Sequence, residues 1–265
     1  MTSRLLHHSA FVLLVGLHAF SAGAQQIPTP QAAPAQQSAA PHHWTYSGED
    51  GPEHWSALEP ANAACAAGKS QSPIDLKATT PAALAPIDFD YRPGTWQVVN
   101  NGHTVQVIPA FGNSIVVGGH RYELIQFHFH HPSEEAIAGK HFDMVIHMVH
   151  KDAEGHLAVV AVLLSAGSAN PVVQTLWDSL SAQEGKLATI PITLNPAALL
   201  PADQHYYTFA GSLTTPPCTE GVRWFVLKSP LDISVEQERT FAILYPNNAR
   251  PLQPLNGRVV VEGLK

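Results

Sequence analysis

Short runs of β-branched and aromatic residues, separated by Gly, Pro, Asn and Asp, dominate the hydrophobic pattern of the chain. Runs of this kind are typical of β-strands bounded by turns, and they predict strands at 95–99, 104–108, 114–117, 124–130, 144–149, 157–164 and 222–227. Helical periodicity is weaker, and it predicts helices at 171–180 and 235–245 with a turn or two near 195–200. The pattern therefore predicts a β-dominated α+β domain with short peripheral helices.

Two segments precede this domain in the sequence. Residues 1–24 combine Arg4, an apolar stretch at 10–20 and the small residues Ala22-Gly23-Ala24, the pattern of a signal peptide cleaved after Ala24. The stretch is shorter than the ~20 residues that span a bilayer, so an uncleaved membrane anchor is the less favoured interpretation. Residues 25–43 are rich in Gln, Ala and Pro and indicate a linker. We expect one domain at 44–265 and a secreted, periplasmic protein.

Charge and cysteine content narrow the partners and the compartment. The net charge of -7 argues against a nucleic-acid partner, which would favour a basic face. The two cysteines are Cys65 and Cys218, and export would place them where disulfides persist. We expect a Cys65–Cys218 bridge, worth on the order of 4–5 kcal/mol in the chain-entropy model. Two buried free thiols are the alternative.

The predicted strand at 124–130 contains two histidines at alternate positions. Side chains alternate along a strand, so His128 and His130 share one face with Gln126. The opposite face is apolar and consists of Ile125, Phe127 and Phe129. Imidazole is a common zinc ligand, and a rigid strand pre-places such a pair at little entropic cost. Two polar-face histidines on a half-exposed strand are the alternative that this motif leaves open.

The predicted strand at 144–149 offers a third ligand. The intervening turn at 132–140 suits a neighbouring strand, and the candidates are His147 and His150. Pattern alone does not choose between them, because they lie on opposite faces, although Val145 and Val149 give the face of His147 the character of a pocket wall. Three protein ligands would leave the fourth zinc position open for water, as in catalytic sites.

Eight short segments identify a family through their content and order. They read GPEHW at 51–55, QSPID at 71–75, NNGHT at 100–104, QFHFH at 126–130, SEE at 133–135, HMVH at 147–150, GSLTTPPC at 211–218 and NARP at 248–251. Together, from Trp44 to the C-terminal region, they resemble the alpha-class carbonic anhydrases of the bacterial exported type. No single segment is specific, but eight in this order are.

The resemblance implies one domain around a large central, mostly antiparallel twisted sheet. It implies reversible hydration of carbon dioxide to bicarbonate and a proton, by zinc-hydroxide attack with a histidine proton shuttle, and it is compatible with a side esterase activity. It selects His128, His130 and His147 as the Zn²⁺ ligands and leaves His150 structural. It also implies inhibition by sulfonamide-type compounds and suggests a homodimer. Neither a membrane nor a nucleic-acid partner is expected.

The resemblance also assigns roles around the metal. Thr214 matches a gatekeeper hydroxyl that accepts the hydrogen of the hydroxide, because it gives its own hydrogen to an ionised carboxylate, matched by Glu134. His103 matches the proton shuttle, since an imidazole with a pKa of about 6.5 relays protons to buffer. The backbone N–H of Thr214 and the side chain of Thr215 are expected to hold bicarbonate.

Carbon dioxide is small and apolar, so its site needs a dry wall beside the metal. The residues that match this wall are Val149, Val159, Leu213, Val222 and Trp224. The polar positions that match the ordered water chain are Tyr46 and Asn101.

The chain departs from the family pattern at one position near the third ligand. Gln126 fits as the hydrogen-bond partner of His128, and the backbone near Asn248 fits for His130. Relatives often carry a glutamate two positions before the third ligand, where this chain has Val145. His147 would then donate to a backbone carbonyl, to water or to another side chain, and we expect weaker zinc retention than in those relatives.

Two other classes of function fit parts of the pattern. Another zinc hydrolase, such as an esterase, is compatible with a three-histidine site, although the sequence has neither a serine nucleophile elbow nor an HExxH motif. A non-catalytic binding protein on this scaffold would be expected to lack a ligand histidine, and all three are present. Carbon dioxide hydration is therefore the favoured function.

Overall fold

The computed structural model describes residues 43–181 and 183–264, which lie in one compact unit that spans Ala40–Lys265. The predicted signal peptide and residues 25–42 of the predicted linker lie outside the described residues and stay predictions. Within the described ranges, no helix is both long and apolar enough to cross a membrane.

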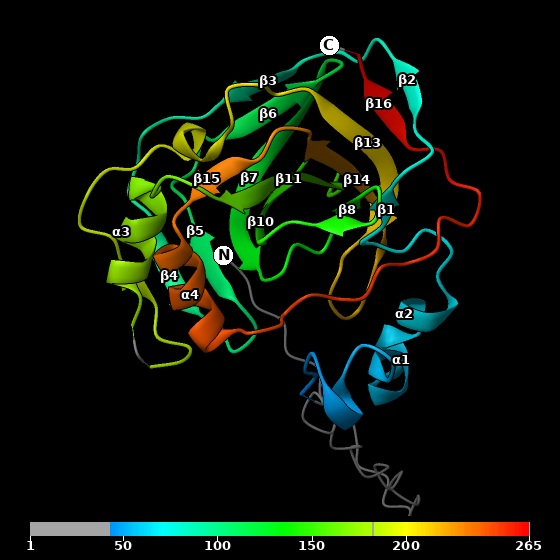
Figure 1. Ribbon diagram of the computed structural model, residues 1–265, viewed down its shortest axis with the longest axis horizontal. Helices are drawn as coiled ribbons and strands as arrows, with labels where there is room; N and C mark the ends of the chain where they lie inside the picture. Colours follow the sequence, from blue (N-terminus) through cyan, green and yellow to red (C-terminus); the bar gives the residue numbers. More distant parts are fainter. Residues whose placement is uncertain (1–42, 182, 265) are drawn as a thin grey trace, which may run out of the picture. The chain divides into compact units, whose positions relative to one another are not determined.

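A large mixed sheet of 13 strands forms the centre of this unit (Figure 1). Its strands are β2 (Thr80–Ala82), β3 (Ile87–Asp90), β4 (Gln97–Asn100), β5 (Val105–Ile108), β6 (Ser114–Val117), β7 (His120–His130), β10 (Met144–Lys151), β11 (Leu157–Ala166), β12 (Ala188–Thr189), β13 (Tyr206–Ser212), β14 (Glu220–Leu227), β15 (Leu231–Ile233) and β16 (Val261–Gly263). The main path runs β12-β4-β5-β7-β10-β11-β14-β13-β16-β2. A smaller sheet joins β1 (Asp75–Leu76), β8 (Ala136–Ile137) and β9 (Lys140–His141).

Most neighbouring strands run antiparallel. The parallel pairs are β11 with β14, β11 with β15, β16 with β2 and, in the smaller sheet, β1 with β8. The predicted strand-dominated fold around a mostly antiparallel sheet is thus confirmed, and all seven predicted strands are present within a few residues of their expected bounds.

The helices are short and lie around the sheet. They are α1 (Trp55–Leu58), α2 (Ala64–Ala67), α3 (Pro171–Ser179) and α4 (Val235–Leu244), with single 3-10 turns η1 (Gly48–Asp50), η2 (Pro60–Asn62) and η3 (Pro196–Leu199). Asn170 caps α3 by accepting from two backbone N–H groups, ahead of Pro171 at the first helical position. Helices α3 and α4 lie side by side (Figure 1), and the ring of Trp177 on α3 is 4.9 Å from that of Phe129 on β7.

The central strands are buried on both faces, which explains their continuous apolar runs. On β10, Met144, Ile146 and Met148 belong to one apolar cluster. Val145 and Val149 belong to a second cluster on the opposite face. His147 shares the face of these two valines, so the second cluster adjoins the histidine.

Residue Ile125 does not follow the predicted alternation of β7. Ile125 is 39% exposed, whereas Leu124 is buried together with Phe127 and Phe129. The pairing of β7 with β10 shifts here, from Gln126 to Leu124 on the β7 side, which leaves Ile125 as the extra residue of a β-bulge. The prediction that Ile125 lies on the apolar face is therefore wrong, and the alternation holds only from Gln126 onward.

Candidate metal centre

Three histidines meet where β7 and β10 pair. Residues at alternate positions of β7 share a face, so His128 and His130 point the same way, and His147 of β10 lies directly opposite His128 in the antiparallel register. One nitrogen from each ring lies within 4.8 Å of the other two. The sequence pattern left His147 and His150 open, and the register places His147 in the cluster.

The outward nitrogen of each ring is held by an acceptor. The pairs are His128 Nδ1 with Gln126 Oε1 at 2.9 Å, His130 Nδ1 with the Asn248 carbonyl at 2.7 Å, and His147 Nε2 with Glu135 Oε2 at 3.1 Å. These bonds fix the tautomers and leave His128 Nε2, His130 Nε2 and His147 Nδ1 to face one another. The Nε2 atom of His130 is buried and has no hydrogen-bond partner among the described residues. Such a set of convergent lone pairs fits a metal ion.

Burial keeps two of these rings neutral. It lowers the pKa of His128 to about 3 and that of His130 well below its ordinary value, and the nearby His147 adds to both effects. Burial also lowers the pKa of His147, but the charges of Glu135 and Glu134 and the Glu135 hydrogen bond outweigh it and raise the pKa overall. Neutral imidazole is the form that binds metal, so His128 and His130 are ready ligands at neutral pH.

The hydrogen bond that His147 donates to Glu135 resolves the departure at Val145. Of the partners predicted for His147, the one present is another side chain, and it is a carboxylate. Glu135 is fully buried. The expectation of weaker zinc retention rested on a missing carboxylate, and the structure removes that premise.

The adjacent carboxyl group, Glu134, lies on the opposite side of His147. Its Oε2 atom is 3.8 Å from His147 Nδ1, and its Oε1 atom accepts the backbone N–H of Arg250 at 2.7 Å. Burial raises the pKa of Glu134 to about 7, and Glu135 adds to the rise. His147, the Arg250 N–H and the Thr214 hydroxyl act in the opposite direction. Glu134 thus lies beside the histidines, and the hydroxyl of Thr214 acts on its pKa, while its Oε2 atom has no hydrogen-bond partner among the described residues.

Thr214 lies in the loop at 213–219 between β13 and β14, and a disulfide closes this loop onto α2. The Cys65–Cys218 bridge is present, as predicted, and the Cys218 N–H donates to the carbonyl of Thr215 at 2.8 Å. Thr214 itself is buried.

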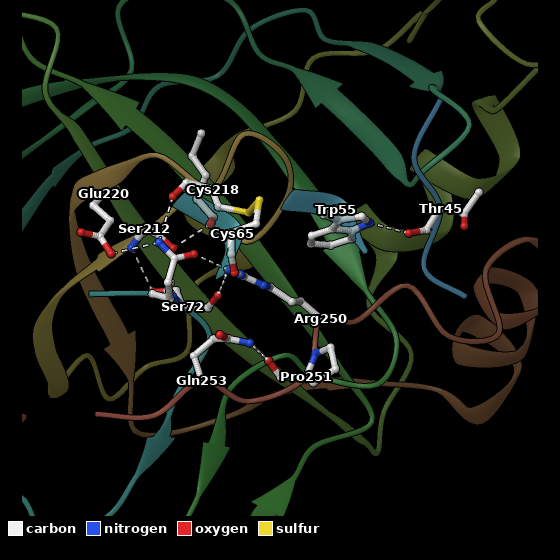
Figure 2. Close-up of a disulfide and its surroundings, with 12 residues drawn as sticks. Thr45, Trp55, Cys65, Ser72, Ser212, Cys218, Glu220, Arg250, Pro251 and Gln253 are labelled. Carbon is white, nitrogen blue, oxygen red and sulfur yellow. Dashed lines mark hydrogen bonds between the residues drawn. A yellow bond between two sulfur atoms is a disulfide. The ribbon is translucent and has the colours of Figure 1, made fainter. Parts of the chain in front are cut away.

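Arg250 joins this disulfide to Glu134. Figure 2 shows its guanidinium directed at the segment that carries Cys65 and Ser72, whose carbonyls it contacts at 2.9 and 2.7 Å. The same residue holds Glu134 through its backbone N–H. In the sequence, Arg250 belongs to the segment at 248–251, which predicts no role for it.

The apolar residues predicted to flank the metal form one continuous wall. Val149 is opposite Val159 in the β10–β11 pairing, and Val159 is opposite Trp224 in the β11–β14 pairing. Val222 belongs to the same buried cluster, and Leu213 packs against it. The Trp224 ring lies 4.9 Å from the ring of His147, so this wall adjoins the histidine cluster.

His103 lies in the turn before β5, at the rim of this region. Its ring is half-buried and stacks on Trp44 with 3.7 Å between centroids. Asn101 Oδ1 accepts the N–H of His103, and Asn248, which also holds His130, donates to the His103 carbonyl. Burial lowers the pKa of His103, and the proximity of His43 lowers it further.

Two further predicted positions have clear surroundings. His150 is fully buried, contacts the Tyr91 hydroxyl at 2.8 Å, and donates from Nδ1 to the Met148 carbonyl, as expected of a structural histidine. Burial raises the pKa of Tyr46 well above its ordinary value, and the charge of Glu134 adds to the rise.

Known proteins are similar to this chain in both sequence and fold. The family model described as eukaryotic-type carbonic anhydrase matches residues 50–263. A carbonic anhydrase of Klebsiella pneumoniae is 45% identical over 223 residues, which cover 83% of this chain and 91% of the relative.

Solved structures give the same result. The alpha-carbonic anhydrase of Thermovibrio ammonificans in complex with sulfanilamide has a TM-score of 0.81 and 43% identity, over 83% of this chain and 99% of that one. Dioscorin complexed with ascorbate has a TM-score of 0.78 and 32% identity, over 84% and 99% of the two chains.

Proposed function

Because the chain belongs to the eukaryotic-type carbonic anhydrase family, we propose that it hydrates carbon dioxide reversibly with a zinc ion held by His128, His130 and His147. The observation that carries the proposal is the convergence of three ring nitrogens whose outward partners are already in place. Zinc binds histidine nitrogen tetrahedrally, and three protein ligands leave one position for water. When bound there, zinc supplies Lewis-acid chemistry that lowers the pKa of this water to near neutrality, as is established for carbonic anhydrases.

Thr214 and Glu134 orient the attacking oxygen. An ionised Glu134 accepts the hydrogen of the Thr214 hydroxyl, so the threonine oxygen is left as an acceptor toward the reacting centre. A cation nearby favours the ionised form and lowers the pKa of Glu134 from its value of about 7. Arg250 holds the same carboxyl in place through its backbone N–H.

The apolar wall accounts for substrate choice. Carbon dioxide has no net charge, so the valines on β10 and β11 and the ring of Trp224 offer it a dry surface next to His147. Thr215, beside Thr214 in the same loop, is proposed to help hold the bicarbonate product. Sulfonamides are proposed as inhibitors because the Thermovibrio enzyme was solved with sulfanilamide bound.

His103 carries the released proton to solvent. Its ring is half-buried against Trp44, next to the exposed His43. Its lowered pKa favours release of a proton to the bulk after it has been received. Tyr46 and Asn101 are proposed to order the water between His103 and the metal.

The disulfide supports an exported enzyme. Disulfides persist mainly in oxidising compartments, and the Cys65–Cys218 bridge ties the Thr214 loop to α2. Together with the N-terminal sequence pattern, this favours a periplasmic enzyme.

The likeness to dioscorin favours a second candidate, a binding protein on the same scaffold. The intact set of three histidines with their partners argues for catalysis instead.

Stopped-flow measurement of carbon dioxide hydration by the zinc-loaded protein tests the proposal. We expect a rate far above that of buffer, abolished by sulfanilamide. A zinc-loaded protein with no rate above buffer would support the binding-protein alternative and contradict the proposal.

A further inference from the structure

Glu135 is a buried carboxylate to which the proposed reaction gives no task. Its side chain is fully buried, and its Oε2 atom lies 3.1 Å from His147 Nε2. The other oxygen, Oε1, is buried and has no hydrogen-bond partner among the described residues. Within the same residues, the ion pair that the Glu135 side chain makes is the one between Oε2 and His147. Burying a carboxylate is unfavourable unless a charge or strong donor compensates it. The compensation must therefore come through His147.

The two adjacent carboxylates flank the two nitrogens of one ring. Glu135 contacts Nε2, while Oε2 of Glu134 lies 3.8 Å from Nδ1. A carboxylate accepts and does not donate, so Nε2 carries the hydrogen and Nδ1 keeps its lone pair. Glu135 thus fixes which nitrogen of His147 faces the metal.

The backbone holds Glu135 in place from both sides. The Ser133 hydroxyl donates to the Glu135 carbonyl at 2.7 Å and accepts the N–H of Phe142 at 2.9 Å. Residue Ala136 begins β8, which pairs with both β1 and β9. The carboxylate therefore projects from the start of a small sheet, and a rigid support of this kind suits the precise orientation of a ligand.

Val145 marks a second place from which a carboxylate could reach the same ring. It lies two positions before His147 on the same face of β10, and it is fully buried in the apolar cluster. On the basis of the proposed zinc site, we infer that Glu135 is the positioning residue for His147. Positions 135 and 145 are then alternative sources of one carboxylate. This chain uses the turn before β8, which leaves position 145 free to be apolar.

The substitution Val145→Glu is expected to have opposite effects on the rate of zinc loss in two backgrounds. Val145→Glu in the wild-type protein brings a second carboxylate to a ring that already has one, and like charges in a buried site repel each other. The same Val145→Glu change in a Glu135→Ala background restores a single carboxylate. The substitution is therefore expected to speed zinc loss in the first case and to slow it in the second.

The rate of zinc loss to EDTA, followed by metal content, tests this independently of catalysis. We expect Glu135→Ala to lose zinc about 10- to 100-fold faster than the wild type. Glu135→Gln should show a smaller increase, because an amide oxygen still accepts the hydrogen bond but carries no charge. The Glu135→Ala/Val145→Glu double variant should return to within a few-fold of the wild-type rate.

Tyr91→Phe is the matched control, because it removes the hydroxyl beside a buried histidine on β10, His150, that lies outside the cluster. It should leave the rate of zinc loss unchanged. Wild-type zinc retention in both Glu135→Ala and Glu135→Gln would overturn the positioning role, and a double variant no better than Glu135→Ala would overturn the equivalence of the two positions. A protein that retains zinc through Glu135 but does not hydrate carbon dioxide would refute only the proposed function.

Discussion

The two faces of β10 each carry a buried histidine, and the pair shows what distinguishes a candidate metal ligand from a buried histidine outside the cluster. His147 and His150 are both almost fully buried, three residues apart on one strand. His150 faces the Tyr91 hydroxyl, and burial lowers its pKa to about 3. The ring of His147 faces two other histidines and two carboxylates. The two carboxylates raise the pKa of His147 despite its burial. Burial is common to both, so the difference lies in what converges on each ring.

The largest expected difference comes from replacing each of the two histidines in turn. His147→Gln removes a proposed zinc ligand, and because metal chemistry is worth several kcal/mol, hydration should fall by roughly 1,000-fold or more. His150→Gln should keep zinc and activity but destabilise the fold by about 1–3 kcal/mol through its lost buried hydrogen bonds. Zinc content, stopped-flow rates and thermal unfolding measure both. Equal zinc loss in the two variants would erase the distinction between the faces.

A smaller effect is expected from the pair beside His147. Thr214→Ala removes the hydroxyl that is proposed to donate to Glu134, and Glu134→Gln replaces the carboxylate with an uncharged, weaker acceptor. Hydrogen bonds to charged groups contribute about 1.5–3 kcal/mol, so kcat/KM should fall by roughly 10- to 100-fold with zinc retained. Because the two residues act as one unit, the double variant should be little worse than either single variant. Fully additive losses would contradict the coupling.

His103→Ala should have a milder effect that depends on buffer. We expect kcat to fall by roughly 10-fold in weak buffer while kcat/KM is preserved, because proton transfer follows the attack on carbon dioxide. Added imidazole should restore the rate. An unchanged kcat in both buffers would refute the shuttle.

An effect confined to acidic solution concerns the pH dependence of stability on the His150 face. The folded-state pKa of about 3 lies below the unfolded value of about 6.5, so the unfolded chain binds more protons between these limits. This contribution is fully present above pH 6.5 and is lost as pH falls toward 3. His150→Gln should lower the slope of unfolding free energy against pH in that window, by up to about 1.4 kcal/mol per unit. Denaturant unfolding at several pH values measures it, and an unchanged slope would count against a neutral buried His150.

Local pattern predicted much of the fold, and the limits have physical causes. The strands that hold the ligands were predicted because alternation and β-branched runs are local properties. The bulge at Ile125 was missed because it depends on the partner strand. Strand β13 was also missed, although its Tyr206-Tyr207-Thr208-Phe209 segment has high β-propensity.

The candidate site residues also divide into those whose contacts follow from local spacing and those brought together by distant segments. Gln126 and His128 belong to one strand face, so their contact follows from spacing. The choice of His147 came from family resemblance, and the strand register accounts for it physically. Glu135 lies 12 positions before His147 and approaches from a different sheet, so no local pattern connects them. In the sequence, Glu135 is marked only by its place in the family segment Ser133-Glu134-Glu135.

X-ray diffraction at the zinc absorption edge, on crystals of the metal-loaded protein, tests the central claim most directly. The account predicts one anomalous peak bonded to His128 Nε2, His130 Nε2 and His147 Nδ1, with His147 Nε2 still on Glu135. A peak bonded to His147 through Nε2, or located instead among Asp152, Glu154 and His156, the other described group of closely spaced metal-binding side chains, would contradict it.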